Sequence, residues 1–286
     1  MKNKVCIITG ANAGIGKKAS IQIASKGYHV IMACRNKERG KIALEEVKKL
    51  SKSDEVELEI VDMSLKESIK SFCDRINKQY DNIDVLIHNA ASFDITQETP
   101  VITAEGFESI WMTNYIGPVY MTSLLIDKIK KSDDPRIITV SSKGLIAMPL
   151  LKIDLKDPEF LNRKFTVTKA YYQSKRALLM YTYWLAKQYK DIGICVNAIR
   201  VTAVKLDSDR IPNVSPFKNW VYKQKAKKSI STEEMAKTYT YLATSNDVKG
   251  ITGKYFDENN KFVNSNSYTT DPKNIEDVIN LTNKYL

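Results

Sequence analysis

The sequence predicts an α/β protein with one doubly wound parallel sheet and helices on both of its faces. Apolar runs of strand length alternate with segments of helical periodicity along most of the 286 residues, and that alternation is typical of parallel sheets. The connections are short, and neither a Gly/Ser-rich or Pro-rich linker nor an internal repeat divides the chain. We therefore expect a single domain that spans residues 1–286.

Each expected strand is a short apolar run, and each expected helix shows apolar residues at helical spacing. The seven strands are predicted at 4–9, 29–33, 56–61, 84–88, 136–140, 193–199 and 253–256. The helices are predicted at 15–26, 37–50, 65–80, 103–131, 165–190, 232–245 and about 272–285. Two longer excursions, 143–164 and 206–231, interrupt this pattern, and such loops in a compact domain are usually functional.

The formal net charge of +11 would be compatible with a nucleic-acid or anionic membrane partner. However, the basic residues are mostly lysines spread along the predicted helices, and "KQKAKK" at 223–228 is the one short cluster. No arginine-rich arm, zinc finger or aromatic RNA-binding signature occurs. We therefore expect solvated helix faces and no nucleic-acid partner.

The cysteines and histidines limit the kinds of metal site, disulfide and catalytic base that the chain can form. The four cysteines are widely scattered and form no Cys-x-x-Cys pair, which argues against a zinc site or a disulfide scaffold and fits a reducing compartment. They are Cys6, Cys34, Cys73 and Cys195. Because His29 and His88 are the only histidines, a histidine base or multi-histidine metal site is nearly excluded. We expect His88 to be a packed residue and no metal to be bound.

Targeting signals are not expected in the chain as given. No run of eighteen or more apolar residues occurs, and an apolar strand pattern follows Met1 almost at once. We therefore expect neither a signal peptide nor a membrane span, and a cytoplasmic protein, unless a leading anchor was removed.

The turn after the first strand, "TGANAGIGK", predicts a dinucleotide site. Gly10, Gly14 and Gly16 let the backbone turn tightly and approach a pyrophosphate, while the helix that follows attracts its charge. A glycine cluster alone is weak evidence for a dinucleotide site, but here it lies between a predicted strand and a predicted helix. Asn12 and Ile15, in the same turn, are expected cofactor contacts too.

The spacing Gly-x-x-x-Gly-x-Gly, preceded by Thr9, resembles that of the short-chain dehydrogenase/reductase family. The resemblance implies a Rossmann-like fold and a nicotinamide cofactor. It also implies a cofactor half at about 1–135 and a catalytic and substrate half at about 136–286.

The end of the second strand predicts the cofactor preference. A carboxylate there would bind a free ribose 2′-hydroxyl, whereas arginine accommodates a 2′-phosphate. The sequence has Cys34 at the acidic position, followed by Arg35 and Asn36. Because a guanidinium recognises phosphate with several donors, NADP(H) is expected; the alternative is that Arg35 is a surface arginine.

Two further turns resemble the adenine and ribose contacts of the family. The first contains Asp62 and Met63, and the second contains Asn89, Ala90 and Ala91. The family usually has Asn-Ala-Gly at the second turn, so Ala91 is a mild departure.

The helix "TVTKAYYQSKRALLMYTYWL" carries Tyr171 and Lys175 four residues apart, hence on one face. An isolated Tyr-x-x-x-Lys is usually a half-buried tyrosine beside a solvated lysine. Here "TVSSKG" ends the fifth strand, and the family resemblance identifies Ser142, rather than Ser141, as the catalytic serine. Since a tyrosine with a pKa near 10 is a poor acid at neutral pH, the nearby ammonium, together with the charge of oxidised nicotinamide, is expected to lower that pKa.

The resemblance also implies roles for the neighbouring residues. Ser142 would hold the substrate oxygen, and Lys175 the nicotinamide ribose. Asn114, in "WMTNYIGP", would sit at a helix irregularity near Gly117-Pro118 and support a water chain to the lysine. Tyr172 lies outside the family spacing and is expected to be a packing or interface residue.

One departure from the family lies after the sixth strand. Val201 and Thr202 replace the usual Pro-Gly pair whose turn meets the nicotinamide carboxamide. Ala203 and Val204 still offer backbone groups, so we expect NADP(H) binding to survive with altered rate or stereochemistry.

The excursion 206–231 is interpreted as an apolar lid over the nicotinamide. An ordinary surface loop, or weak contact with an anionic membrane, are the alternatives. Its apolar members are Ile211, Pro212, Phe217, Trp220, Val221 and Tyr222.

Across the chain, the resemblance is greatest to the retinol dehydrogenase and carbonyl reductase branch. This implies an NADP-dependent enzyme that interconverts a lipophilic carbonyl, retinoid- or steroid-like, and an alcohol, with Tyr171 as acid-base. A homodimer or homotetramer through the helices after strands four and five is common in the family. The rival from another class is a catalytically silent NADP-binding sensor or scaffold, favoured by the altered turn. A sugar epimerase would generally need a longer C-terminal part.

Overall fold

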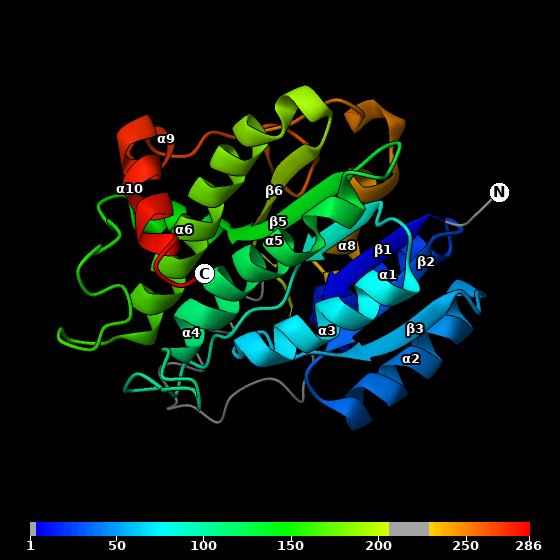
Figure 1. The fold of residues 1–286 in the computed structure, drawn as a ribbon, viewed down its shortest axis with the longest axis horizontal. Helices are drawn as coiled ribbons and strands as arrows, with labels where there is room; N and C mark the ends of the chain where they lie inside the picture. The colour runs from blue at the N-terminus through cyan, green and yellow to red at the C-terminus, as the bar shows by residue number, and fades with distance from the viewer. Residues whose placement is uncertain (1–3, 206–228) are drawn as a thin grey trace.

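The computed structural model describes residues 4–205 and 229–286. In this part of the chain seven parallel strands form one sheet in the order β3-β2-β1-β4-β5-β6-β7 (Figure 1). The strands are β1 (Val5–Thr9), β2 (His29–Cys34), β3 (Val56–Ile60), β4 (Val85–His88), β5 (Arg136–Ser142), β6 (Cys195–Val201) and β7 (Tyr255–Phe256). The order reverses between β1 and β4, where open α/β sheets bind ligands. The predicted doubly wound fold is confirmed.

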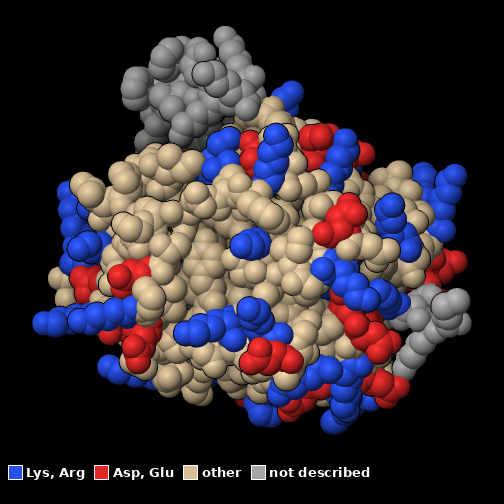
Figure 2. Space-filling view, turned by 90° about the horizontal axis from the view of Figure 1, so that it is seen from above, with Lys and Arg blue, Asp and Glu red and all other residues tan. Residues whose placement is uncertain are grey.

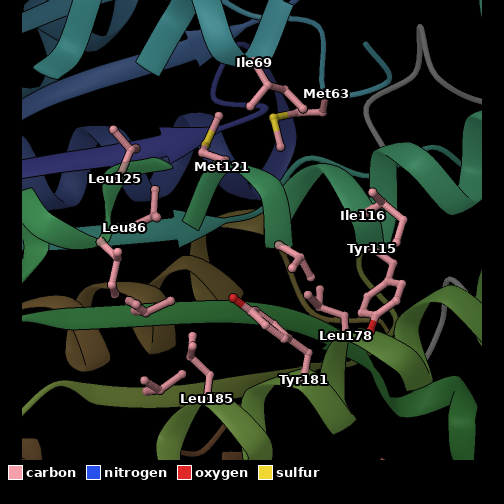
Figure 3. Close-up of a cluster of buried hydrophobic side chains, with 14 of the residues drawn as sticks. Met63, Ile69, Leu86, Tyr115, Ile116, Met121, Leu125, Leu178, Tyr181 and Leu185 are labelled. Carbon is pink, nitrogen blue, oxygen red and sulfur yellow. The ribbon is translucent and has the colours of Figure 1, made fainter. Parts of the chain in front are cut away.

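Helices cover both faces of this sheet. They are α1 (Gly14–Ala24), α2 (Lys37–Ser51), α3 (Lys66–Gln79), α4 (Ser109–Trp111), α5 (Gly117–Ile129), α6 (Val167–Gln188), α8 (Thr232–Thr244), α9 (Ser267–Thr270) and α10 (Pro272–Thr282). One apolar core joins the sheet to α3, α5 and α6, and a second joins it to α1, α2 and α8. Figure 3 shows part of the first core, to which α5 contributes Met121 and Leu125 and α6 contributes Leu178 and Tyr181.

The sixth strand runs two residues further than its predicted end at 199. Val201 pairs with Ser142, and Arg200 pairs with Ser141, so β5 is also longer than predicted. Proline at position 201 would lack the backbone N–H and favour a turn, whereas β-branched valine suits a strand. The missing Pro-Gly pair thus coincides with the strand extension.

The helix predicted at 103–131 begins later, because residues 103–107 form a turn. Gly106 has φ +85°, and Thr103 N donates to Phe107 O at 2.8 Å. The Glu108 carboxylate then accepts from Ile110 N and Trp111 N at 3.0 and 2.7 Å, and so caps α4. Glycine at positive φ ends any earlier helical path.

The C-terminal helix α10 packs beside α6, as Figure 1 shows for the red and green ribbons. Val278, Ile279 and Leu281 are buried in the core that contains α6. Tyr115 and Thr282 form a buried hydrogen bond between the region preceding α5 and α10. Part of the helical face on which a dimer was predicted is therefore covered by the chain itself.

Basic and acidic side chains are interspersed on the face drawn in Figure 2. Among the described residues, no helix is both long and apolar enough to cross a membrane. The expected lid residues and the 223–228 cluster lie outside the described part of the chain, within 206–228.

Candidate active site

A cavity of about 520 Å³ opens at the carboxyl ends of the central strands, beside the reversal in strand order. Every residue predicted to contact the cofactor lines this cavity, except Tyr171 and Lys175. Arg39, Phe93, Asp94, Thr113 and Thr232 also line it, and sequence reasoning missed them. The cavity therefore unites turns from β1, β2, β4 and the chain just after β3 and β6.

The glycine turn approaches the neighbouring backbone too closely for side chains. Gly10 has φ +67°, and a Cβ there would lie 2.9 Å from Ala90 Cα. At Gly16 a Cβ would lie 2.5 Å from Asn89 Nδ2 and 2.6 Å from Gly10 O. Only glycine fits both positions without movement, and the resulting cradle leaves backbone exposed to the cavity.

The N-terminus of α1 is the positive end of a helix dipole at this cradle. Within the described residues no side chain caps it, and its first turn has no acidic residue. By contrast, Asn36 caps α2 and Thr166 caps α6 through their side chains. A helix start with uncapped N–H groups suits a pyrophosphate, so the protein groups here fit a dinucleotide.

Asn89 and Thr9 hold the glycine turn against the end of β4. Asn89 Nδ2 donates to Thr9 O at 2.9 Å and to Gly10 O at 3.2 Å. Thr9 Oγ1 accepts from Asn89 N and Ala90 N, each at 3.0 Å. Tyr239 donates to Asn89 Oδ1 at 3.1 Å. The amide predicted to contact the cofactor is thus engaged in shaping the turn that surrounds it.

Two arginines line the cavity where β2 ends. Arg35 follows the buried Cys34, and Arg39 lies one helical turn into α2. Asn36 Oδ1 accepts from Arg39 N at 2.9 Å, so this amide caps the helix that carries the second arginine. Two guanidinium groups line the cavity here, which favours a phosphate.

Some side-chain atoms of the turn after β3 have partners within the protein. Asp62 Oδ1 accepts from Ser64 N at 2.9 Å and from Ser64 Oγ at 2.6 Å. Met63 is 4% exposed, and its side chain points into the first core beside Ile69 (Figure 3). Both residues line the cavity, but one oxygen of Asp62 and the side chain of Met63 have internal partners.

Tyr171 and Lys175 lie one turn apart on α6, as predicted. Lys175 is 1% exposed, and its Nζ donates to Val140 O at 2.9 Å. This nitrogen lies 5.7 Å from the centroid of the Tyr171 ring. The lysine is therefore not the solvated residue that an isolated Tyr-x-x-x-Lys would contain.

Burial dominates the ionisation of both groups. It lowers the pKa of Lys175 to about 7 and raises the pKa of Tyr171 above its ordinary value. The predicted lowering of the tyrosine pKa by the neighbouring ammonium is thus not produced by the protein groups alone. Hydrogen bonding to Ser142 does favour the phenolate and acts against burial.

The two serines at the end of β5 have different hydrogen-bond partners. Ser141 is 1% exposed, and its hydroxyl donates to Lys175 O at 3.2 Å. Ser142 Oγ instead accepts from Gly144 N at 3.2 Å and interacts with the phenol of Tyr171. Ser142 is therefore the serine that shares a site with the tyrosine.

Asn114 lies in a π-helical turn, Met112–Ile116, between α4 and α5. Its Oδ1 accepts from Ser92 N at 2.6 Å, and its Nδ2 donates to Ser92 O at 3.0 Å and to Ser174 Oγ at 3.1 Å. The expected helix irregularity is present. Asn114 is fully buried and joins the loop after β4 to the residue before Lys175.

His88 is a packed residue, in line with the prediction. Its Nε2 lies 2.8 Å from Thr122 Oγ1. Burial, with a smaller contribution from Lys175, lowers its pKa to about 3. The ring is therefore neutral at physiological pH and adds no charge beside the lysine.

Comparison with known proteins identifies the family to which this geometry belongs. The family described as short chain dehydrogenase matches residues 4–150, and the family described as enoyl-(acyl carrier protein) reductase matches residues 161–257. The chain belongs to the short-chain dehydrogenase/reductase family. It is similar to retinol dehydrogenase 13 from Mus musculus, with 31% identity over 264 residues that cover 89% of this chain and 75% of the relative. This places the short-chain dehydrogenase/reductase close to the retinol dehydrogenase branch.

Solved structures share the fold of this short-chain dehydrogenase/reductase. A protein from Mycobacterium paratuberculosis matches with a TM-score of 0.75 and 23% identity, and covers 98% of this chain and 92% of its own. A short-chain dehydrogenase from Shigella flexneri, solved in complex with NADP, matches with a TM-score of 0.67 and 20% identity over 91% of this chain and 98% of its own.

Beyond β6, the segment 203–205 of this short-chain dehydrogenase/reductase is held in place by backbone hydrogen bonds. Ile230 N donates to Ala203 O at 3.1 Å, and Lys205 N donates to Ile230 O at 2.9 Å. Val204 lines the cofactor cavity between them. The altered turn thus retains a fixed backbone beside the cavity without proline or glycine.

Proposed function

We propose that this protein is an NADP(H)-dependent oxidoreductase that interconverts a carbonyl compound and its alcohol, with Tyr171 as acid-base. One observation carries the proposal: Ser142, at the carboxyl end of β5, shares a site with Tyr171 and a buried Lys175 from α6. A protein that only bound the dinucleotide would have no need to place Ser142 beside this tyrosine.

Each group has a distinct task in the reduction. NADPH, when bound at the cradle, supplies the hydride. Tyr171 delivers its phenolic proton to the developing alkoxide, and Ser142 donates a hydrogen bond to the same oxygen. Lys175 is proposed to hold the ribose and stabilise the phenolate that Tyr171 becomes, and Asn114 donates to the side-chain hydroxyl of Ser174, the residue before that lysine.

The preference for NADP(H) over NAD(H) is proposed from Arg35 and Arg39. Replacing Arg35 by Ala should weaken NADPH binding by about 10- to 100-fold, because a charge-assisted contact to phosphate is lost. NADH binding should change little, since NADH lacks the 2′-phosphate. Fluorescence titration with both cofactors measures the ratio.

Arg75→Ala is the matched control, because Arg75 pairs with Glu59 on the surface at 2.8 Å and does not line the cavity. Equal losses for NADPH and NADH in Arg35→Ala would contradict the assignment of Arg35 to the 2′-phosphate.

A lipophilic substrate is proposed from the apolar and aromatic surroundings of Tyr171. The Phe93 ring packs 4.7 Å from the Tyr171 ring while 44% of Phe93 remains exposed. The similar protein from Mus musculus is named a retinol dehydrogenase, so retinoid-like and steroid-like carbonyls are the first compounds to test.

The proposal also includes the cellular compartment, membrane contact and oligomeric state. Four buried, unpaired thiols fit a reducing, cytoplasmic setting. Weak membrane contact through 206–231 and a homodimer or homotetramer remain expectations, and α10 limits the area that the α6 face offers to a second copy.

A panel of aldehydes and ketones tested with NADPH and NADH separates this function from that of a silent sensor. We expect cofactor oxidation that depends on the carbonyl and is faster with NADPH. Tight NADPH binding without turnover on any member of the panel would favour the sensor, whose one supporting observation is the replaced Pro-Gly turn.

A further inference from the structure

The side chain of Tyr172 lies beside the strand end that carries Ser142. The family spacing gives this residue no role, and its position in the sequence predicted only packing or subunit contact. In the structure its ring packs edge-on against the ring of Tyr171, with centroids 5.2 Å apart and an interplanar angle of 72°. Both rings are partly buried. Tyr172 therefore belongs to the same aromatic group as the proposed acid-base.

Gly144 leaves the space in which the Tyr172 hydroxyl lies. A Cβ at position 144 would overlap the Tyr172 oxygen and would lie 2.5 Å from its Cε1. Gly144 is not among the glycines with positive φ, so its backbone conformation does not require glycine. The tyrosine ring, rather than the turn, explains the missing side chain, and the contact fixes where the hydroxyl sits.

The side chain of Ser142 interacts with two phenols and with one backbone donor. Gly144 N donates to Ser142 Oγ at 3.2 Å. The hydroxyls of Tyr171 and Tyr172 both interact with the Ser142 side chain, and burial raises the pKa of each phenol. The backbone of Ser142 is held separately, since Tyr255 donates to Ser142 O at 3.3 Å. This contact does not fix the orientation of the Ser142 hydroxyl, which depends on the groups around that hydroxyl.

A serine hydroxyl has one proton and two lone pairs. The Gly144 N–H engages one lone pair. We propose that the Tyr172 hydroxyl, seated on Gly144, donates to the second lone pair and so directs the Ser142 proton toward the reacting oxygen. Tyr172 is thus a positioning residue that acts through Ser142, and the assignment rests on the proposed carbonyl reduction.

The test compares Tyr172→Phe, which keeps the ring, with wild type and Ser142→Ala. We expect Tyr172→Phe to lower kcat about tenfold, because a misdirected donor weakens the hydrogen bond made in the transition state, with KM within about twofold. In the Ser142→Ala background, Tyr172→Phe should have no further effect.

Tyr183→Phe is the matched control. Tyr183 is another partly buried tyrosine on α6, and its hydroxyl lies 3.1 Å from the hydroxyl of Ser265. It should retain wild-type kcat. Wild-type turnover in Tyr172→Phe, or losses that multiply in the double variant, would overturn the assignment.

Crystal structures of the same variants provide a readout that does not depend on activity. We expect one Ser142 side-chain conformer in wild type and Tyr183→Phe, and a changed or mixed conformer in Tyr172→Phe. If wild type reduces no carbonyl, the proposed function fails, and an unchanged Ser142 conformer in Tyr172→Phe would still refute the positioning role by itself.

Discussion

Tyr171→Phe should lower kcat for carbonyl reduction by about 10³- to 10⁴-fold, at the upper end of what general acid catalysis contributes. The variant removes the proposed proton donor but keeps the ring that packs on Phe93 and Tyr172 at 4.7 and 5.2 Å. The fold and the phosphate cradle should therefore be unaffected. Steady-state kinetics with NADPH, together with the melting temperature and the Kd for NADPH, separate loss of chemistry from loss of structure.

The control for this prediction is again Tyr183→Phe, because it removes a phenolic hydroxyl from the same helix away from the site. If Tyr171→Phe turned over as fast as wild type with an unchanged pH profile, Tyr171 would not be the acid. If instead NADPH binding were lost along with activity, the residue would serve the cofactor rather than the proton transfer.

Lys175→Met should remove most activity and at the same time stabilise the fold. Lys175 is 1% exposed, and its Nζ donates to Val140 O at 2.9 Å. Replacing a buried charge of this kind by an apolar side chain of similar length should raise the free energy of unfolding by about 2 kcal/mol below pH 7. A residue that weakens the fold while it serves chemistry is typical of active sites.

The pH dependence of this gain follows from the direction of the pKa shift. Burial lowers the pKa of Lys175 from 10.5 to about 7, so between these values the unfolded chain binds a proton that the folded chain does not. Wild-type stability therefore rises with pH in this window. The advantage of Lys175→Met should be full below pH 7 and should shrink as the pH rises toward the ordinary pKa of lysine.

Urea unfolding of the cofactor-free protein at several pH values measures this difference. Lys187→Met, at an exposed position on the same helix, should change stability little at any pH. A Lys175→Met variant that is less stable than wild type at pH 6.5 would mean that the ammonium has partners that outweigh its burial.

The doubly wound sheet and the helix positions were predictable because apolar periodicity reports which residues face a core. The residues at which helices and strands begin and end were less predictable. The sequence pattern did not include Val201 in β6, since the paired partner Ser142 lies far away in sequence. Gly106 did carry a turn signal inside the helix predicted at 103–131, and a positive φ at this glycine is what delays the helix start.

The site residues were predicted from the spacing of motifs in the sequence. Such spacing indicates where a residue lies along the fold, but not which other residues it contacts. It could not reveal that the Asn89 amide holds the glycine turn, because that contact depends on how β1 and β4 approach one another. It could not reveal the burial of Lys175 either. Arg39 did have a signal, a second arginine four residues after Arg35. Tyr172 had none, since its importance arises from contact with Gly144 across a loop.

Reduction with NADPH deuterated at the transferring position tests the central claim most directly. The protein is incubated with a carbonyl from the panel, and the alcohol is examined by mass spectrometry. The account predicts one deuterium on the alcohol carbon with wild type and almost none with Tyr171→Phe over the same time. Alcohol formed without deuterium, or equal labelling by the two proteins, would contradict it.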